Sequence, residues 1–248
     1  MKKLVLAASL FAAFASTASA QQAAASDHTF TGNLTVASDY RFRGISQTFG
    51  RPAVQGGFDY AHSSGFYVGN WNSNVSGNQY PDGAGLEMDL YAGYKFEAMP
   101  GLTADVGLLK YYYPGAAIAG IKPDALELYI GATYNWFSAK YSHAVSDDYF
   151  GFTNADGSYY LDLNANFEIA EKTTLGFHVG RQKFKNAGAF DYTDYKIGVT
   201  RDFGFATLGL ALVATNAESA NYTYSNASGT KTKDVSKNTA VLSISKTF

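Results

Sequence analysis

Few residues of the chain have the type and spacing that catalysis requires. The four histidines are His28, His62, His143 and His178, and there is no cysteine. His62-Ser63-Ser64 has the His-x-Ser spacing of some lipid hydrolases built into membrane barrels, but this segment contains no acidic residue to orient the imidazole. Ser142 and His143 are consecutive, so on a strand they would point to opposite faces. We therefore predict no catalytic residue.

Metal and cofactor chemistry is equally weakly represented. The absence of cysteine excludes disulfides, thiol catalysis and zinc–thiolate sites. His178 is expected on a polar strand face near Glu168 of a neighbouring strand, an arrangement more typical of a hydrated contact than of a metal site. No cluster of residues has metal-ligand spacing, so we predict no metal and no cofactor.

Charged residues that alternate with apolar ones are more informative. If they share the inner wall of a water-filled pore, nine acids stand against five bases. The acids are Asp39, Asp59, Glu87, Asp89, Asp105, Glu127, Asp162, Glu168 and Asp194; the bases are Arg41, Arg43, Lys95, Lys140 and Lys196. Rings of fixed charge at a constriction allow a pore to choose between ions. The candidates for such a role are Asp39, Arg41, Arg43, Glu87, Asp89, Glu127, Asp162, Asp194 and Lys196.

The N-terminus has the three parts of a secretory signal peptide. Met1-Lys2-Lys3 is basic, an apolar run extends from Leu4 to about Ala15, and Ala18-Ser19-Ala20 is a small-residue cleavage pattern. We expect residues 1–20 to be this signal peptide and residues 21–248 to form one domain. Loss of the two lysines would change the formal net charge from −2 to −4. That acidic balance argues against nucleic acid as a partner.

Strands, rather than helices, must position the charged residues. Segments of about ten residues with period-two alternation recur along the chain. In one, Leu86, Met88 and Leu90 alternate with Glu87, Asp89 and Tyr91. The clearest segments are 29–42, 86–96, 126–136, 159–169 and 239–248, and weaker ones are 53–61, 65–74, 102–112, 137–145, 173–183, 192–201 and 205–215. The sequence thus predicts an all-β protein of about 12 strands.

The connections between these segments alternate in length. Short ones fall at 62–64, 98–101, 135–136, 170–172 and 202–204, and long ones at 44–52, 75–85, 114–124, 146–157, 184–191 and 216–236. Short periplasmic turns and long extracellular loops are typical of antiparallel outer-membrane β-barrels. An even number of strands would leave both chain ends on the periplasmic side. We therefore predict a transmembrane antiparallel β-barrel.

The apolar face of this barrel is expected to meet lipid. Twelve tilted strands give a backbone radius of about 12 Å, too wide for inward apolar side chains to fill. Aromatic residues also gather near the strand ends, where interfacial girdles form. They are Tyr40, Phe42, Trp71, Tyr94, Phe96, Tyr134, Trp136, Phe167 and Phe248. The polar face would then line the lumen.

The end of the chain resembles the closing strand of bacterial outer-membrane barrels. Ala240, Leu242, Ile244, Lys246 and Phe248 share one face, and the strand ends on the aromatic residue. The resemblance implies that this strand pairs with the first and that Phe248 is an assembly signal read by the barrel assembly machinery. Lys246 departs from the pattern, but a lysine near an interface can extend its ammonium group into water.

A more specific resemblance lies in the first hundred residues. Asp39-Tyr40-Arg41-Phe42-Arg43-Gly44-Ile45-Ser46-Gln47-Thr48 resembles the opening motif of the TorF family, a proteobacterial group of porin-like proteins of previously unknown function. The segments 55–60, 64–71 and 87–94 continue the similarity. The resemblance implies an outer-membrane barrel that acts as a channel, and it carries no catalytic residues.

The leading functional hypothesis is an outer-membrane porin for passive diffusion of small polar solutes or ions. The excess of inward acids would lean the selectivity toward cations. The alternatives are a barrel enzyme of the lipid hydrolase type, which the weak histidine chemistry disfavours, and a structural or adhesive barrel without transport. The expected partners are outer-membrane lipid, the assembly machinery and the solute. The transported solute and the oligomeric state stay open.

Overall fold

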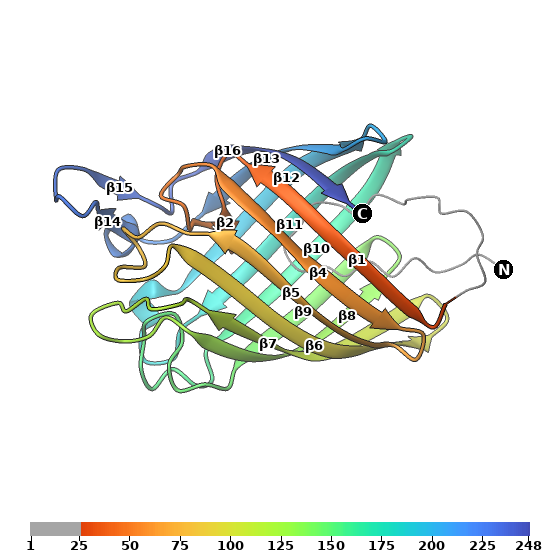
Figure 1. Ribbon diagram of the computed structural model, residues 1–248, viewed down its shortest axis with the longest axis horizontal. Coiled ribbons are helices and arrows are strands. Elements are labelled where there is room, and N and C mark those ends of the chain that lie inside the picture. The colour runs from red at the N-terminus through yellow and green to blue at the C-terminus, as the bar shows by residue number, and fades with distance from the viewer. Residues whose placement is uncertain (1–25) are drawn as a thin grey trace.

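The chain forms a closed antiparallel β-barrel, seen from the side in Figure 1 in a computed structural model that describes residues 26–248. The predicted signal peptide, residues 1–20, lies outside the described residues. Twelve strands form the barrel, as predicted, and each pairs with its two neighbours. They are β1 (His28–Ala37), β4 (Ala53–His62), β5 (Phe66–Asn74), β6 (Leu86–Met99), β7 (Leu102–Tyr112), β8 (Ala125–Tyr134), β9 (Phe137–Ala144), β10 (Tyr159–Ala170), β11 (Thr173–Lys183), β12 (Tyr192–Asp202), β13 (Thr207–Thr215) and β16 (Thr239–Thr247).

The first and last barrel strands close the sheet. β1 pairs with β16 from Asn33 opposite Thr247 to Ala37 opposite Ser243. The amide of Phe248 adds a bond to the carbonyl of Gly32 at 2.9 Å, and the amide of Gly32 returns one at 2.7 Å. Because a closed barrel pairs every strand edge, its backbone is satisfied without water, which is the condition for strands in a bilayer.

Minor elements lie in the connections. Two short hairpins are β2 (Arg41–Phe42) with β3 (Ile45–Ser46), and β14 (Thr223–Ser225) with β15 (Thr232–Asp234). Two 3-10 turns are η1 (Gly188–Phe190) and η2 (Ser219–Tyr222). Among the described residues no helix is long and apolar enough to cross a membrane. The long connections gather at the left of Figure 1 and the short ones at the right. We call these the long-loop end and the short-turn end.

The alternation along each strand separates an apolar outer face from a polar inner face. Phe30, Phe58 and Ile130 are exposed on the outside, whereas Glu87 and Glu127 are completely buried on the inside. Leu161, Leu163 and Ile169 of β10 are likewise exposed. Such a surface is suited to lipid rather than to water.

The structure corrects the prediction at three aromatic residues. Tyr40, Phe42 and Trp71 were expected in an outer girdle, but all three are buried inside the barrel. The first predicted strand, 29–42, actually ends at Ala37, and residues 38–52 fold back into the lumen; we call this segment the inner loop. Tyr94, Phe96, Tyr134, Trp136 and Phe248 are exposed on the outer surface, and Phe167 packs against Trp136 with ring centroids 5.8 Å apart.

Candidate functional site

The inner loop is built around a two-residue hairpin turn. Arg43 and Gly44 connect β2 to β3, and both have positive φ, +47° and +81°. Two consecutive positive φ values are typical of the turn that joins tightly twisted strands. A Cβ at Gly44 would lie 2.6 Å from Cγ2 of Thr215 and 2.7 Å from Cβ of Asp194. Glycine is therefore required there, because the turn touches the barrel wall at β12 and the end of β13.

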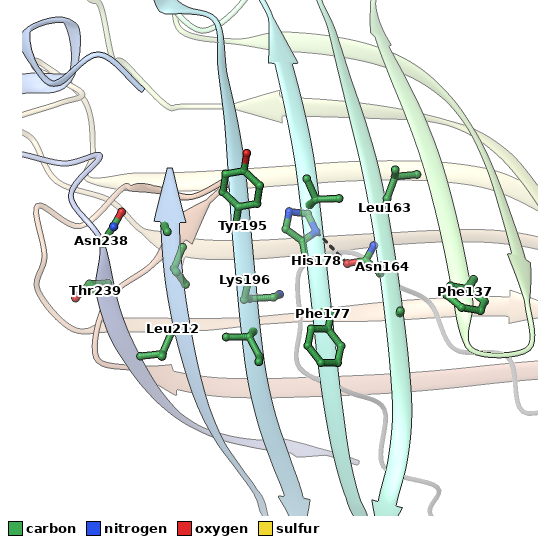
Figure 2. A pocket seen from close by; sticks show the side chains of 15 residues that line it. Phe137, Leu163, Asn164, Phe177, His178, Tyr195, Lys196, Leu212, Asn238 and Thr239 are labelled. Atoms are coloured by element: carbon green, nitrogen blue, oxygen red, sulfur yellow. Dashed lines mark hydrogen bonds between the residues drawn. The ribbon is translucent and has the colours of Figure 1, made fainter. Parts of the chain in front are cut away.

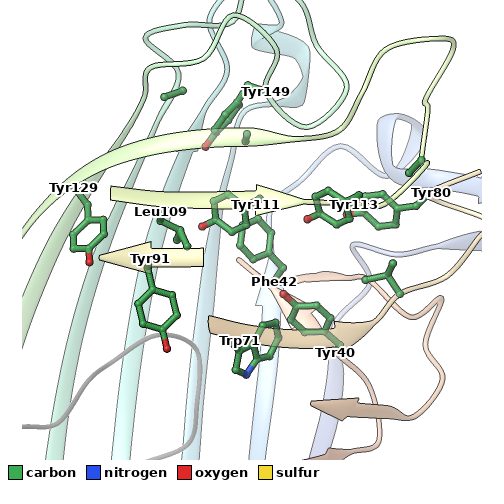
Figure 3. Close-up of a cluster of buried hydrophobic side chains, with 14 of the residues drawn as sticks. Tyr40, Phe42, Trp71, Tyr80, Tyr91, Leu109, Tyr111, Tyr113, Tyr129 and Tyr149 are labelled. Carbon is green, nitrogen blue, oxygen red and sulfur yellow. The ribbon is translucent and has the colours of Figure 1, made fainter. Parts of the chain in front are cut away.

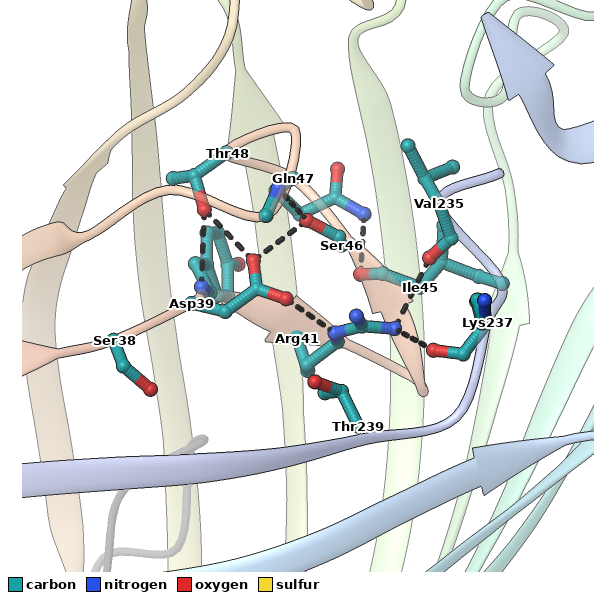
Figure 4. Close-up of polar contacts among 12 residues, drawn as sticks. Ser38, Asp39, Arg41, Ile45, Ser46, Gln47, Thr48, Val235, Lys237 and Thr239 are labelled. Carbon is teal, nitrogen blue, oxygen red and sulfur yellow. Dashed lines mark hydrogen bonds and ion pairs between the residues drawn. The ribbon is translucent and has the colours of Figure 1, made fainter. Parts of the chain in front are cut away.

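Asp39 organises the base of the inner loop (Figure 4). Its Oδ2 accepts a bond from Arg41 Nε at 2.6 Å, and its Oδ1 accepts bonds from Ser46 Oγ at 2.6 Å and Thr48 Oγ1 at 2.9 Å. Arg41 Nη1 also donates to the carbonyls of Val235 at 3.1 Å and Lys237 at 2.9 Å. This network ties the loop to the chain that leads into β16.

Arg43 carries the tip of the inner loop across the lumen. Its Nη2 donates to both oxygens of Glu127 on β8, at 2.7 and 2.9 Å. Its Nη1 donates to Tyr149 Oη and to Gln182 Oε1, each at 2.7 Å. The guanidinium also lies 4.2 Å from the ring centroid of Tyr160. These contacts anchor the loop to β8, β11 and the β9–β10 connection, on the far side of the barrel from β1.

The Arg43–Glu127 pair is shielded from water. The two side chains are 2% and 0% exposed. Burial opposes the charged form of Arg43, but the Glu127 carboxylate and nearby phenol oxygens hold the Arg43 pKa above its ordinary value. Burial also raises the pKa of Tyr149, so its phenol stays neutral and can donate to Glu127 Oε1 at 2.7 Å. The arrangement is a charged strut held by both terminal nitrogens of Arg43, while its buried Nε has no partner among the described residues.

Aromatic side chains fill the space between the inner loop and the wall formed by β5–β8 (Figure 3). The Tyr40 ring packs edge-on against Trp71 at 5.3 Å, and its hydroxyl donates to Glu87 Oε1 at 2.9 Å. Phe42 packs against Tyr111 at 5.4 Å. Asp89, 4% exposed, lies on the same face of β6 as Glu87. The lumen near the long-loop end is thus largely filled by protein.

Between the inner loop and the short-turn end, the inner face of β6–β12 carries a row of charges. Lys95 pairs with Asp105 at 3.7 Å. His178 places Nε2 2.8 Å from Asp194 Oδ1 and Nδ1 3.1 Å from Asp162 Oδ1. Figure 2 shows His178 and Lys196 on the neighbouring strands β11 and β12, with His178 bonded to Asn164 at 3.0 Å. Lys196 is exposed although it faces inward, so the lumen is open at this level.

The predicted selectivity residues therefore fall into separate groups. Arg43 meets Glu127, whereas Arg41 pairs with Asp39 within the inner loop. Arg41 was expected near the end of the predicted strand 29–42 and Arg43 just beyond it, but both lie in the inner loop because β1 ends at Ala37. Asp162, Asp194 and Lys196 lie on the wall beneath the loop. Their role in selectivity stays a prediction.

Several site residues were absent from the prediction or assigned to other neighbours. His178 contacts Asp162 and Asp194 rather than Glu168, which pairs in the sheet with Thr174. Tyr111, Tyr149, Tyr160 and Gln182 bind or cover Arg43. For Tyr111, Tyr160 and Gln182, the only signal in the sequence was that period-two alternation places them on the inner face of β7, β10 and β11. Tyr149 lies in a loop, where alternation predicts nothing.

The remaining candidates named from the sequence lie outside the lumen. His62 Nδ1 lies 2.8 Å from Ser64 Oγ in an exposed turn, but the nearby Asp27 bonds Ser63 rather than His62. Among the described residues no group of three or more metal-ligating side chains is present. The ring of Phe248 lies over Gly32, where a Cβ would come within 2.7 Å of its Cε2. Glycine on β1 thus accommodates the terminal ring on the outer surface.

Comparison with protein families is decisive for membership. A family model described as "Bacterial protein of unknown function (Gcw_chp)" matches residues 21–248. The chain belongs to this bacterial family. Among curated proteins there is no match.

Solved structures of outer-membrane porins share the fold. The KdgM porin has a TM-score of 0.55 at 8% identity, over 88% of this chain and 98% of that chain. A KdgM porin in complex with disordered oligogalacturonate has a TM-score of 0.53 at 7% identity, over 88% and 97%. The NanC porin has a TM-score of 0.52 at 10% identity, over 86% and 97%. At these identities the similarity concerns the fold: this chain has a porin-like barrel.

Proposed function

We propose that this Gcw_chp protein is a non-enzymatic outer-membrane channel for passive diffusion of small polar solutes or ions. The observation that carries the proposal is that the barrel has its apolar face outside and its polar face inside, the reverse of a soluble barrel. The outside is apolar, while the inside carries ionised groups, one of which, Lys196, is exposed within the lumen. A barrel of this size with a polar, hydrated interior is suited to conduct solutes.

The fold relatives support this proposal. The porins KdgM and NanC share the fold, and one solved KdgM complex contains disordered oligogalacturonate. We extend the proposal to small solutes as partners, together with outer-membrane lipid and the assembly machinery. The resemblance to the TorF family, and export through a cleaved signal peptide at residues 1–20 to the cell outer membrane, belong to the same proposal.

The inner loop is the proposed constriction of the channel. It spans the lumen from β1 to the Arg43 contacts with β8 and β11, so solutes must pass beside it. The expected cation preference rests on the nine acids and five bases of the inner face and the inner loop. Glu87 and Asp89 are buried beside this constriction and form no ion pair among the described residues. Glu87 accepts a bond from Tyr40 of the inner loop, and Asp89 lies opposite Trp71 in the sheet.

A second candidate is a structural barrel without transport. The specific observation that favours it is the inner loop itself, because Arg43 and the aromatic cluster fill much of one cross-section. An enzyme of the lipid hydrolase type has no comparable support, since His62 and Ser64 lack an acidic partner in their turn.

Conductance measurement separates a channel from a structural barrel. The full mature chain, refolded and added to a planar bilayer, should give discrete current steps. Folding would be confirmed separately by β-sheet circular dichroism and by the shift in gel mobility on heating. A folded, membrane-inserted protein that never gives current steps would contradict the channel and favour the structural barrel.

A further inference from the structure

Two lysines on the inner wall lack a carboxylate partner. Lys140 on β9 and Lys196 on β12 have no acidic oxygen within 4.0 Å, and neither makes a hydrogen bond among residues 26–248. The nearest contact of Lys140 is the ring of Tyr129, 5.4 Å from its Nζ. By contrast, Lys95, Arg41 and Arg43 are all in ion pairs. These two ammonium groups are the free cations of the lumen wall beneath the inner loop.

The acids between the two lysines are already occupied. The register places Lys140 opposite Asp162 on β10 and Lys196 opposite His178 on β11. His178 presents one ring nitrogen to Asp162 and the other to Asp194. Asn164 Nδ2 also donates to Asp162 Oδ1 at 2.7 Å, and Tyr160 Oη donates to Asp194 Oδ2 at 3.0 Å. The two carboxylates therefore have little hydrogen-bonding capacity left for the lysines.

The local charge is positive although the whole lumen is acidic. Because both ring nitrogens of His178 face carboxylate oxygens, both are placed to donate, as in the protonated ring. One imidazolium and two ammonium groups then oppose two carboxylates, which leaves one positive charge. The neighbouring acids Glu127 and Asp105 do not cancel it, because each is paired with a cation of its own, Arg43 and Lys95.

The two lysines are near enough across the lumen to reach one solute. β9 and β12 are three strands apart in a ring of twelve, a quarter of the circumference. On a backbone radius of about 12 Å this places the two Cα atoms about 17 Å apart, and extended side chains would bring the ammonium groups to about 8 Å. Lys140 Nζ lies over the ring of Tyr129 on β8, on the side of β9 away from β12. To meet the same solute as Lys196, the Lys140 side chain must turn from this ring into the open lumen.

We propose that Lys140 and Lys196 form a binding subsite for carboxylate-bearing solutes within the lumen, beneath the inner loop. This inference deepens the proposed channel function and rests on it. A solute with two acidic groups would bridge the two ammonium groups, because Asp162 and Asp194 between them already accept bonds from Asn164, Tyr160 and His178. The charge-assisted bonds supply affinity, and the hydrated lumen permits release.

The test uses succinate as probe and its neutral diamide as control. Binding to the full mature chain in detergent micelles at low salt would be followed by ligand-detected NMR titration, which does not depend on conduction. Wild-type protein should bind succinate saturably and ignore the diamide. The double variant Lys140→Met with Lys196→Met should weaken binding at least tenfold. The double variant with arginine at both positions should retain it, and Lys185→Met, in an exposed loop, should change nothing.

The outcomes separate the subsite from the channel. Equal succinate binding by wild type and the double methionine variant, or equal binding of the diamide, would overturn the subsite. Folding of each variant would be checked by heat-dependent gel mobility, and the arginine variant covers the case in which methionine prevents folding. Lysine-dependent binding without any bilayer current would leave the subsite standing and refute the channel. Current steps without lysine-dependent binding would support the channel and refute the subsite.

Discussion

Replacing Arg43 by methionine should release the inner loop and enlarge the conducting path. The substitution leaves the Glu127 carboxylate buried, 0% exposed, with the hydroxyls of Tyr149 and Tyr111 as remaining donors. Removing one partner of a buried ion pair typically costs about 3–5 kcal/mol. Since about 1.4 kcal/mol is a factor of ten, the ratio of docked to undocked loop should fall by about two to four orders of magnitude.

Single-channel recording in planar bilayers measures this change. Arg43→Met should give larger or noisier current steps than wild type, because the loop no longer holds its position across the lumen. The double variant Arg43→Met with Glu127→Gln should be less perturbed, since it removes both charges and leaves no carboxylate unpaired. Lys185→Met is the matched control: its partner Asp156 is 57% exposed, and such surface pairs contribute little. Identical conductance and noise in Arg43→Met and wild type would refute the role of the strut.

Three further outcomes are expected. A tag inserted between residues 216 and 236 should be accessible on intact cells, and one at residues 170–172 should not; equal labelling of both would reverse or invalidate the orientation. Phe248→Asp should lower the amount of protein inserted in the outer membrane far more than Phe203→Asp, an exposed aromatic of a short turn; equal yields would remove Phe248 as the assembly signal. In a salt gradient the wild-type channel should prefer cations, and this preference should weaken between 0.1 M and 1 M salt as the Debye length falls from about 10 to about 3 Å; anion preference would contradict the charge count.

The barrel could be predicted because each strand repeats the same physical requirement. A strand between lipid and water must alternate apolar and polar side chains, so Leu86 to Tyr91 already show both the period and the face. The terminal aromatic and the alternation of short and long connections added independent support. Strand ends came within a few residues of their observed positions, except at β1.

The inner loop could not be predicted from the same signal. Asp39-Tyr40-Arg41-Phe42 continues the alternation of β1, so period two gives no sign that the strand has ended. The usable cue was the glycine after Arg43, which marks a turn. The position of Trp71 was predicted wrongly for a related reason. The aromatic residue of the alternating segment was assigned to the outer face, but Trp71 faces inward and its neighbours Asn70 and Asn72 face outward. Near the long-loop end the inner face of the barrel also carries aromatic side chains, because the apolar residues of the inner loop pack against them.

The sites on the inner wall depend on register, which no single sequence reveals. Lys140 meets the row of Asp162, Gly180 and Asp194 through three separate strand pairings. Each pairing is set by turn geometry and by cross-strand contacts, and a shift of two residues would preserve every side-chain face. The types of charge in the lumen were therefore predictable, but their partners were not.

The position of the inner loop in the chain has a consequence for folding. The loop lies between the first two barrel strands, yet Arg43 bonds groups 84, 106 and 139 residues further along. Contacts of such long sequence separation form slowly, because the intervening chain must be ordered first. The Arg43 contacts therefore cannot form before β8 and β11 are in place. We expect the passage to reach its narrow form late in folding, with or after the wall that the loop docks against.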